Sequence, residues 1–169
     1  MPVVAQEERS GALRPFGLSE ALIRLSSGER LHALFELQCK GPPFYCYHGA
    51  GCPDGPPLVP LWDWCDSVTG VWVRDGRLEF IRFDIEAAAE YEVLAKTEQG
   101  LWGRVFLDLY EARDDLSAED FREAARVVGF RFLDQLVGAY ESAELSSVEA
   151  YAAFVKELVR GIDGGTGVT

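Results

Sequence analysis

The chain has 169 residues, which is enough for one domain with a sizeable core. Hydrophobic residues make up 48% of it and aromatic residues 12%, which excludes a disordered protein. Its net charge of −12 argues against unaided binding to nucleic acid or to anionic membranes, because both are negatively charged. No apolar run approaches the roughly 18 residues of a membrane span. The polar start of the chain shows no secretory signal, so we expect a cytoplasmic protein with reduced thiols.

The negative charge is concentrated in the second half of the chain. Residues 1–83 carry ten acidic and eight basic side chains, whereas residues 84–169 carry 18 acidic and eight basic ones. Two interpretations of this asymmetry stay open. The acidic side chains form a solvated surface that keeps the protein soluble, or they form a surface that speeds the capture of a basic partner.

The start of the chain predicts short helices. Residues 1–16 are expected to be a loose leader. Apolar residues then recur at helical spacing over 18–25, and again over 29–38 after the helix-breaking Gly28. Glycine and proline interrupt residues 41–57 so often that we expect a long loop there, and loops of this length are often functional.

The middle of the chain is typical of an antiparallel sheet. Residues 58–64 form a candidate strand whose proline indicates an edge position or a bulge. The Asp75-Gly76 pair joins two alternating runs, 68–74 and 77–85. This is the strongest short-range signal for a β-hairpin, because the tight turn needs positive φ angles. The second run is apolar on both faces, so we expect both to be covered, and we predict a further short strand over 91–95.

The last third of the chain predicts a series of helices. Thr97 is a candidate N-cap for a helix that runs to about residue 111. Ser117 followed by Asp120 resembles a capping box, which marks the start of the next helix. Two more helices are predicted, over 130–140 and 147–160.

This order of elements predicts an α+β fold. Helices precede the strands and follow them without βαβ alternation, so we expect a central antiparallel sheet flanked by N-terminal and C-terminal helices. We expect a single domain over residues 17–161. The glycines after the last helix predict a flexible tail at 162–169.

Cysteine and histidine side chains suggest an alternative based on metal or nucleophile chemistry. Zinc would find four candidate ligands near the predicted loop: Cys46, His48, Cys52 and Cys65. No C-x-x-C pair is present, and idle reduced thiols are the competing interpretation. A cysteine nucleophile would have His32 or His48 as its base, but no recognised catalytic motif is present. A small zinc-binding or hydrolytic enzyme built around the Cys46–Cys65 loop is therefore the alternative function.

Aromatic side chains cluster in the predicted sheet. Trp62, Trp64 and Trp72 lie close together in sequence, and Tyr45 and Tyr47 precede them. These side chains either fill the core and cover the sheet, or they form a partner-binding platform, since tryptophan and tyrosine are frequent anchors of protein interfaces. The candidate contact residues of such a platform, with its charged rim, are Tyr45, Tyr47, Trp62, Asp63, Trp64, Asp66, Trp72, Arg74, Asp75 and Glu79.

Three short segments of this sheet region carry a family resemblance: PLVPLW at 57–62, DSVTGVW at 66–72, and LEFI at 78–81 after the hairpin turn. They resemble the sheet of the SUKH (Smi1/Knr4-like) superfamily. The segments 97–101 and 106–111 are similar to the helix that follows that sheet in some bacterial members. The resemblance covers roughly residues 57–111, about a third of the chain.

What the resemblance implies is an α+β domain with a non-enzymatic role, often as a bacterial immunity protein that neutralises a polymorphic toxin. It transfers no catalytic residue. We therefore expect a protein-binding domain without cofactor or bound metal, whose partner is a protein and not a nucleic acid or a membrane. A nuclease toxin would suit an acidic partner, because a cleft built for phosphates is basic.

Overall fold

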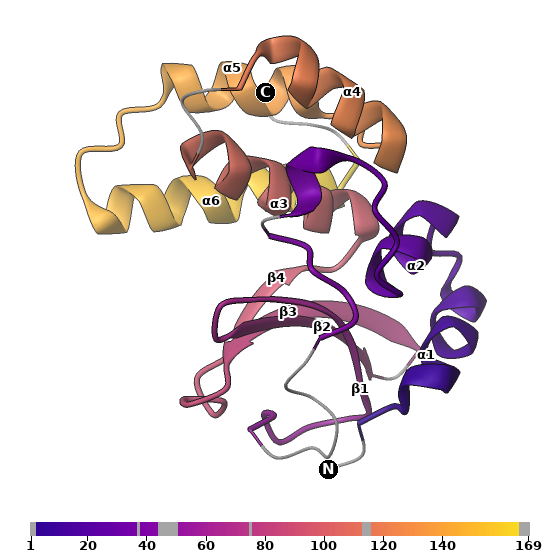
Figure 1. The fold of residues 1–169 in the computed structure, drawn as a ribbon. Coiled ribbons are helices and arrows are strands. Elements are labelled where there is room, and N and C mark those ends of the chain that lie inside the picture. Colours follow the sequence, from indigo (N-terminus) through magenta and orange to yellow (C-terminus); the bar gives the residue numbers. More distant parts are fainter. Residues whose placement is uncertain (1–2, 37, 44–50, 75, 113–115, 166–169) are drawn as a thin grey trace. The chain divides into compact units, whose positions relative to one another are not determined.

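The structure is a computed structural model that describes residues 3–36, 38–43, 51–74, 76–112 and 116–165. The contacts within the chain gather into two compact units, residues 1–94 and residues 95–169. The first unit holds an antiparallel sheet with short helices, and the second holds four longer helices (Figure 1). The α+β class predicted from the sequence is thus confirmed. The expectation of a single domain over 17–161 stays a prediction.

Four strands form one sheet, in the order in which they occur along the chain: β1 (Leu58–Trp64), β2 (Ser67–Arg74), β3 (Arg77–Asp84) and β4 (Glu92–Ala95). The β1–β2 and β2–β3 pairs are antiparallel. Arg74 pairs with Arg77, so the second hairpin closes across the two residues that the sequence marks as a turn. Gly76 has a φ of +73°, which explains why glycine stands there. The strands predicted at 58–64, 68–74 and 77–85 are confirmed.

The proline of β1 lies beside a β-bulge at the edge of the sheet, as its residue type predicted. The pairing register between β1 and β2 shifts between Pro60 and Trp62. Isolated bridges join Val3 to Leu58 and Lys40 to Asp63 along β1. Proline is tolerated here because a bulged edge strand does not need every backbone donor for its ladder.

Both faces of the β2–β3 hairpin are covered, as the sequence predicted. Phe80 and Ile81 are neighbours on β3 that point to opposite faces, and each is 0% exposed. On the Ile81 face, a core cluster also includes Leu58, Val68, Trp72 and Phe83. Parts of the chain outside the strands pack against this cluster, among them Val3, Cys52 and Ile85.

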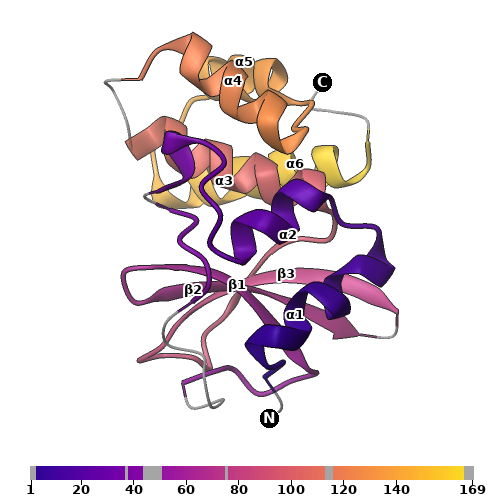
Figure 2. The same cartoon turned by 45° about the vertical axis from the view of Figure 1, so that its right-hand side comes forward.

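The start of the chain is helical, so the expected loose leader over 1–16 is wrong. Helix α1 spans Gln6–Leu13, a 3₁₀ turn follows at Arg14–Phe16, and helix α2 spans Glu20–Ser26 with Ser19 as its N-cap. Both helices contact β1 (Figure 2). The sequence hides α1 because Leu13 is its one large apolar side chain, so no helical period is visible. Packing on the sheet stabilises such a helix where pattern does not.

The helix expected over 29–38 is also wrong. The structure has only a 3₁₀ turn, Ala33–Glu36, among the described residues of this stretch. Here the backbone amide of Leu34 donates to Nδ1 of His32, at 3.2 Å. A side chain that takes a backbone donor in this way competes with the helical hydrogen bonds. The apolar side chains Leu34 and Phe35 are nevertheless buried, as their spacing suggested.

The second unit contains the predicted helices. They are α3 (Glu98–Ala112), α4 (Ala118–Val128), α5 (Leu133–Ser142) and α6 (Val148–Asp163). Helix α3 packs against α5 and α6, and α4 packs against α5 (Figure 1). None of the helices in the described ranges is long and apolar enough to cross a membrane.

Side-chain caps define where these helices begin. The amide of Gly100 donates to Oγ1 of Thr97, which confirms Thr97 as the cap of α3. Ser117 and Asp120 form a reciprocal capping box at the start of α4, and Ser147 caps α6. These polar residues satisfy backbone amides that have no partner inside the helix, which is why local sequence located the helix starts.

Asp163 at the end of α6 joins the two longest helices of the second unit. Its carboxylate accepts hydrogen bonds from the backbone amides of Lys96 and Thr97, both at 2.9 Å, and from the Thr97 hydroxyl at 2.6 Å. A Cβ at position 100 would overlap this carboxylate, so Gly100 permits the close approach. Ile162 is 2% exposed. Residues 162 and 163 are therefore part of the fold and not of the flexible tail expected from 162 onward.

Replacement of this carboxylate tests its contribution. We expect Asp163→Ala to lower the free energy of unfolding by about 2 kcal/mol, because it leaves three donors at the start of α3 without their charged acceptor. Chemical denaturation followed by circular dichroism measures the loss. The control is Glu157→Ala, which removes an exposed carboxylate of the same helix that is paired with Arg160. It should cost less than about 0.5 kcal/mol. Equal effects of the two variants would contradict the proposed role of Asp163.

Candidate functional site

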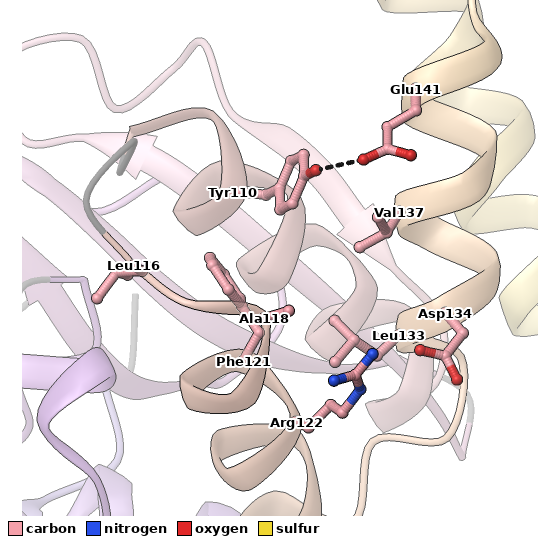
Figure 3. Close-up of a pocket in the computed structure, with 9 residues that line it drawn as sticks. All are labelled: Tyr110, Leu116, Ala118, Phe121, Arg122, Leu133, Asp134, Val137 and Glu141. Atoms are coloured by element: carbon pink, nitrogen blue, oxygen red, sulfur yellow. Dashed lines mark hydrogen bonds between the residues drawn. The ribbon is translucent and has the colours of Figure 1, made fainter.

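A pocket between α3, α4 and α5 is the strongest candidate site in the helical unit. It encloses about 420 Å³. Its lining residues come from all three helices and from the segment before α4: Tyr110, Leu116, Ala118, Phe121, Arg122, Leu133, Asp134, Val137 and Glu141 (Figure 3). Both apolar and charged side chains line the pocket, so it has an apolar interior and a charged rim.

The floor of the pocket is apolar and firmly held. Phe121 is 4% exposed and Leu133 is 8% exposed, so both are anchored in the packing between the helices.

Gly129, with a φ of +68°, ends α4 in the left-handed conformation and lets the chain turn back into α5. The side chain of Gln99 bridges this turn, since it donates to the Gly129 carbonyl at 2.9 Å and accepts from the Arg131 amide at 3.1 Å.

The rim carries two exposed carboxylates and one exposed guanidinium. Val137 and Glu141 follow Asp134 by three and seven positions on α5, so the three side chains share one face of that helix. The hydroxyl of Tyr110 donates to Glu141 at 2.9 Å, which holds this carboxylate at the upper end of the pocket (Figure 3). Arg122 enters from α4 and lies 3.7 Å from Glu119.

A tyrosine–carboxylate network links α3 to α5 and α6. The hydroxyl of Tyr151 donates to Glu111 at 2.7 Å. The rings of Tyr110 and Tyr140 meet edge to face, with centroids 5.5 Å apart. Arg104 and Asp108 add a partly buried ion pair at 3.1 Å. The network fixes the helix that supplies Tyr110 to the pocket.

The same network keeps these phenols protonated. The hydrogen bond to Glu141 raises the pKa of Tyr110 above its ordinary value, and burial raises it further. Burial is the main cause that raises the pKa of Tyr140 and of Tyr151, with Glu111 as the acceptor that adds to it. Neutral phenols donate hydrogen bonds, so each phenol helps to orient the carboxylate that accepts from it.

This arrangement suits the binding of an amphipathic, positively charged group. An apolar side chain fits the floor, and cationic groups fit the carboxylates at the rim. Arg122 opposes cations at its end of the pocket.

The structure does not bring the predicted tryptophan platform together on one surface. Trp62 pairs with Thr69 and Trp72 lies three residues further along the same strand, so the two indoles point to opposite faces of the sheet. Trp62 is 2% exposed and Trp72 is 0% exposed, so both are core residues. The interpretation of these two as surface anchors is corrected here, because a fully packed indole has no area left to offer a partner. Trp64 does share the face of Trp62, and it is 48% exposed.

The charged residues expected around the platform do not gather on the face of the exposed Trp64. Asp63 is 9% exposed on the Trp72 face, Asp66 is exposed in the turn between β1 and β2, and Glu79 pairs with Trp72 across the strands. Tyr45, Tyr47 and Asp75 lie outside the described residues, as does the side chain of Arg74.

The predicted zinc and nucleophile residues are partly outside the described ranges too. Cys46 and His48 fall within residues 44–50, whereas Cys52 is half-buried and Cys65 exposed. Within the described residues, no three histidine, cysteine, aspartate or glutamate side chains gather as a metal site. His32 and the buried Cys39 line a separate cavity of about 300 Å³ in the first unit.

The helical pocket was not identified from the sequence. Phe121, Leu133 and Val137 belong to apolar stripes at helical spacing, a pattern that predicts only which side chains share a helix face. The sequence does carry one signal for this site. Asp134 lies in the predicted helix over 130–140 and Glu141 directly follows it, so the two carboxylates are two helical turns apart, with the apolar Val137 between them. Only the packing of three helices shows that this face borders a hollow.

No family model, curated protein or solved structure matches the chain.

The tryptophans provide a direct test of core against surface. We expect Trp72→Ala to lower the free energy of unfolding by about 3–5 kcal/mol, since it empties a packed site in the sheet core. Trp64→Ala removes a side chain that is 48% exposed and should cost about 1 kcal/mol or less. Urea denaturation of both variants measures the difference. Comparable losses in the two variants would contradict the assignment of Trp72 to the core and of Trp64 to the surface.

The tyrosine network predicts a loss of stability at alkaline pH. A raised pKa means that the folded chain holds the phenol proton more tightly than the unfolded chain does. The stabilisation is therefore complete below about pH 10, the ordinary tyrosine value, and falls as the pH rises above it. Tyr151→Phe should flatten this fall in urea unfolding between pH 9 and pH 11.

The matched control is Tyr91→Phe, because Tyr91 is a 40% exposed tyrosine whose ring contact with Trp72 a phenylalanine preserves. This variant should keep the steep alkaline slope. A slope that is unchanged in Tyr151→Phe would rule out Tyr151 as its source.

Proposed function

We propose that this chain is a non-enzymatic protein-binding protein whose partner is basic. The observation that carries the proposal is the helical pocket, with an apolar floor and two carboxylates on its rim, in a chain with a net charge of −12. Apolar anchors slow the release of a partner, whereas charges of the opposite sign speed its capture.

The acidity extends over both structural units. Residues 1–94 and residues 95–169 each carry 14 acidic and eight basic side chains. The asymmetry between the halves of the sequence arises because Asp84, Glu86, Glu90 and Glu92 follow residue 83 but belong to the sheet unit. A basic partner would therefore be attracted by either unit, and contact chemistry must select the docking surface.

The resemblance to the SUKH superfamily supports a more specific proposal: an immunity protein that neutralises a toxin. A nuclease toxin has a basic cleft for phosphates, and an acidic protein that covers this cleft would block it. Fast capture matters for such a protein, because the toxin acts from the moment it is present.

Several acidic residues of the helical unit have structural tasks and are poor choices for testing attraction. Asp108 pairs with Arg104, Glu111 accepts from Tyr151, and Asp120 belongs to the capping box. Glu119 and Glu123 are exposed on α4 and serve better.

The test is capture followed by kinetics. The tagged chain should retain a basic protein, either from native lysate or as the purified product of a neighbouring gene. Stopped-flow measurement then gives the association rate of the purified pair. We expect Glu119→Gln/Glu123→Gln to slow association by about threefold or more at low salt. The same change should alter the free energy of unfolding by no more than about 0.5 kcal/mol.

The control keeps the net charge equal. Glu7→Gln/Glu8→Gln removes two exposed carboxylates from α1 in the other unit, and it should slow association less. Failure to retain any protein at low or high salt would refute the proposed function. So would the turnover of a small substrate that a single polar substitution abolishes.

A further inference from the structure

The rim of the helical pocket has a spacing that matches a helix. Asp134 and Glu141 are seven residues apart on α5, so they lie about 10 Å apart along the helix axis. Val137 stands between them on the same face. A partner helix laid against α5 would present its own residues at the same two-turn interval, with one residue between them directed at the pocket.

The floor beneath this row accepts an apolar side chain. The buried side chains of Phe121 and Leu133 form this floor, and the half-buried Val137 and Tyr110 also line the pocket. An apolar anchor placed here is removed from water on several sides, which is the arrangement of helix-in-groove recognition.

The geometry points to one occupant, which is an amphipathic helix of the basic partner. This inference rests on the proposed protein-binding function. One apolar side chain of that helix enters the pocket, and two basic side chains two turns apart pair with Asp134 and Glu141. The hydroxyl of Tyr110 holds Glu141 in place at 2.9 Å while leaving the carboxylate other acceptor positions for the incoming cation.

Arg122 carries a positive charge, whose effect on the binding of a cation is opposite to that of the rim carboxylates. Its guanidinium comes from α4 and lines the same pocket as Asp134 and Leu133 (Figure 3). It disfavours a cation at that end of the pocket. Removal of the Arg122 charge should therefore strengthen binding of a basic helix, whereas removal of either rim carboxylate should weaken it.

The probe is a short alanine-based helical peptide that carries two lysines two turns apart with a leucine between them. Nuclear magnetic resonance of the full chain with this peptide should show saturable shifts of amides in α4 and α5 at low salt. Two matched peptides serve as controls. One has glutamates in place of the lysines and the other has serine in place of the leucine, and both should bind at least about threefold more weakly.

Variants of the chain give the sign test. Asp134→Asn and Glu141→Gln should each weaken peptide binding by about two- to fivefold at low salt, and Arg122→Gln should strengthen it by a similar factor. All three residues are exposed, so thermal unfolding should confirm that each variant folds. Absence of saturable shifts at millimolar peptide overturns the inference, and so does equal binding of the lysine and glutamate peptides or an unchanged affinity in all three variants.

Failure of this inference is distinguishable from failure of the proposed function. If a basic protein is captured but Asp134→Asn, Glu141→Gln and Arg122→Gln leave its affinity unchanged, the chain binds through another surface and only the pocket assignment is wrong. If the peptide binds as expected but no protein is captured, the pocket stands and the proposed function fails.

Discussion

The carboxylate of Asp163 is the interaction on which the helical unit depends most. It accepts three hydrogen bonds from Lys96 and Thr97, which lie 67 and 66 residues earlier in the chain, and so it joins the start of the unit to its end. A negative charge at the N-terminus of α3 is also favourable to the helix dipole. With α6 fixed against α3, the tyrosine network and the apolar stripe of α5 have a firm surface to pack on. Leu133 and Val137 of that stripe line the pocket.

The pocket shows how a stable helical core can leave a binding surface at its edge. Phe121 and Leu133 contribute to packing and to the floor at the same time, so the floor is rigid before any partner arrives. The rim side chains Asp134, Glu141 and Arg122 are exposed, and Glu141 also accepts a hydrogen bond from Tyr110 of α3. Binding chemistry can change at Asp134 and Arg122 with little cost to the fold, and a preformed floor loses little entropy when a partner docks.

Polar residues of this chain divide into those that join or cap its helices and those that lie exposed on the surface. Asp120, Asp163 and Glu111 each accept a hydrogen bond that fixes a helix or joins two of them. Glu119 and Glu123 remain at the surface of α4. A count of acidic residues does not separate these groups, although it describes the long-range field that both produce.

The sequence by itself determined the local features of the structure. The hairpin at Gly76, the bulge beside Pro60, the caps at Thr97 and Ser117, and the α+β class were all predictable. Each depends on a few neighbouring residues, whose backbone preferences and hydrogen bonds act within one turn or one strand pair.

The tertiary structure alone decided the features that join distant segments. The sequence pattern could not show that α1 packs on β1, that a 3₁₀ turn follows His32 in place of a helix, or that Asp163 reaches Thr97. Register decided that Trp72 is buried away from Trp62, and three helices together decided that an apolar stripe borders a pocket. The physical reason is that burial and concavity are properties of surfaces brought together in space, and spacing along one segment records only which side chains share its face.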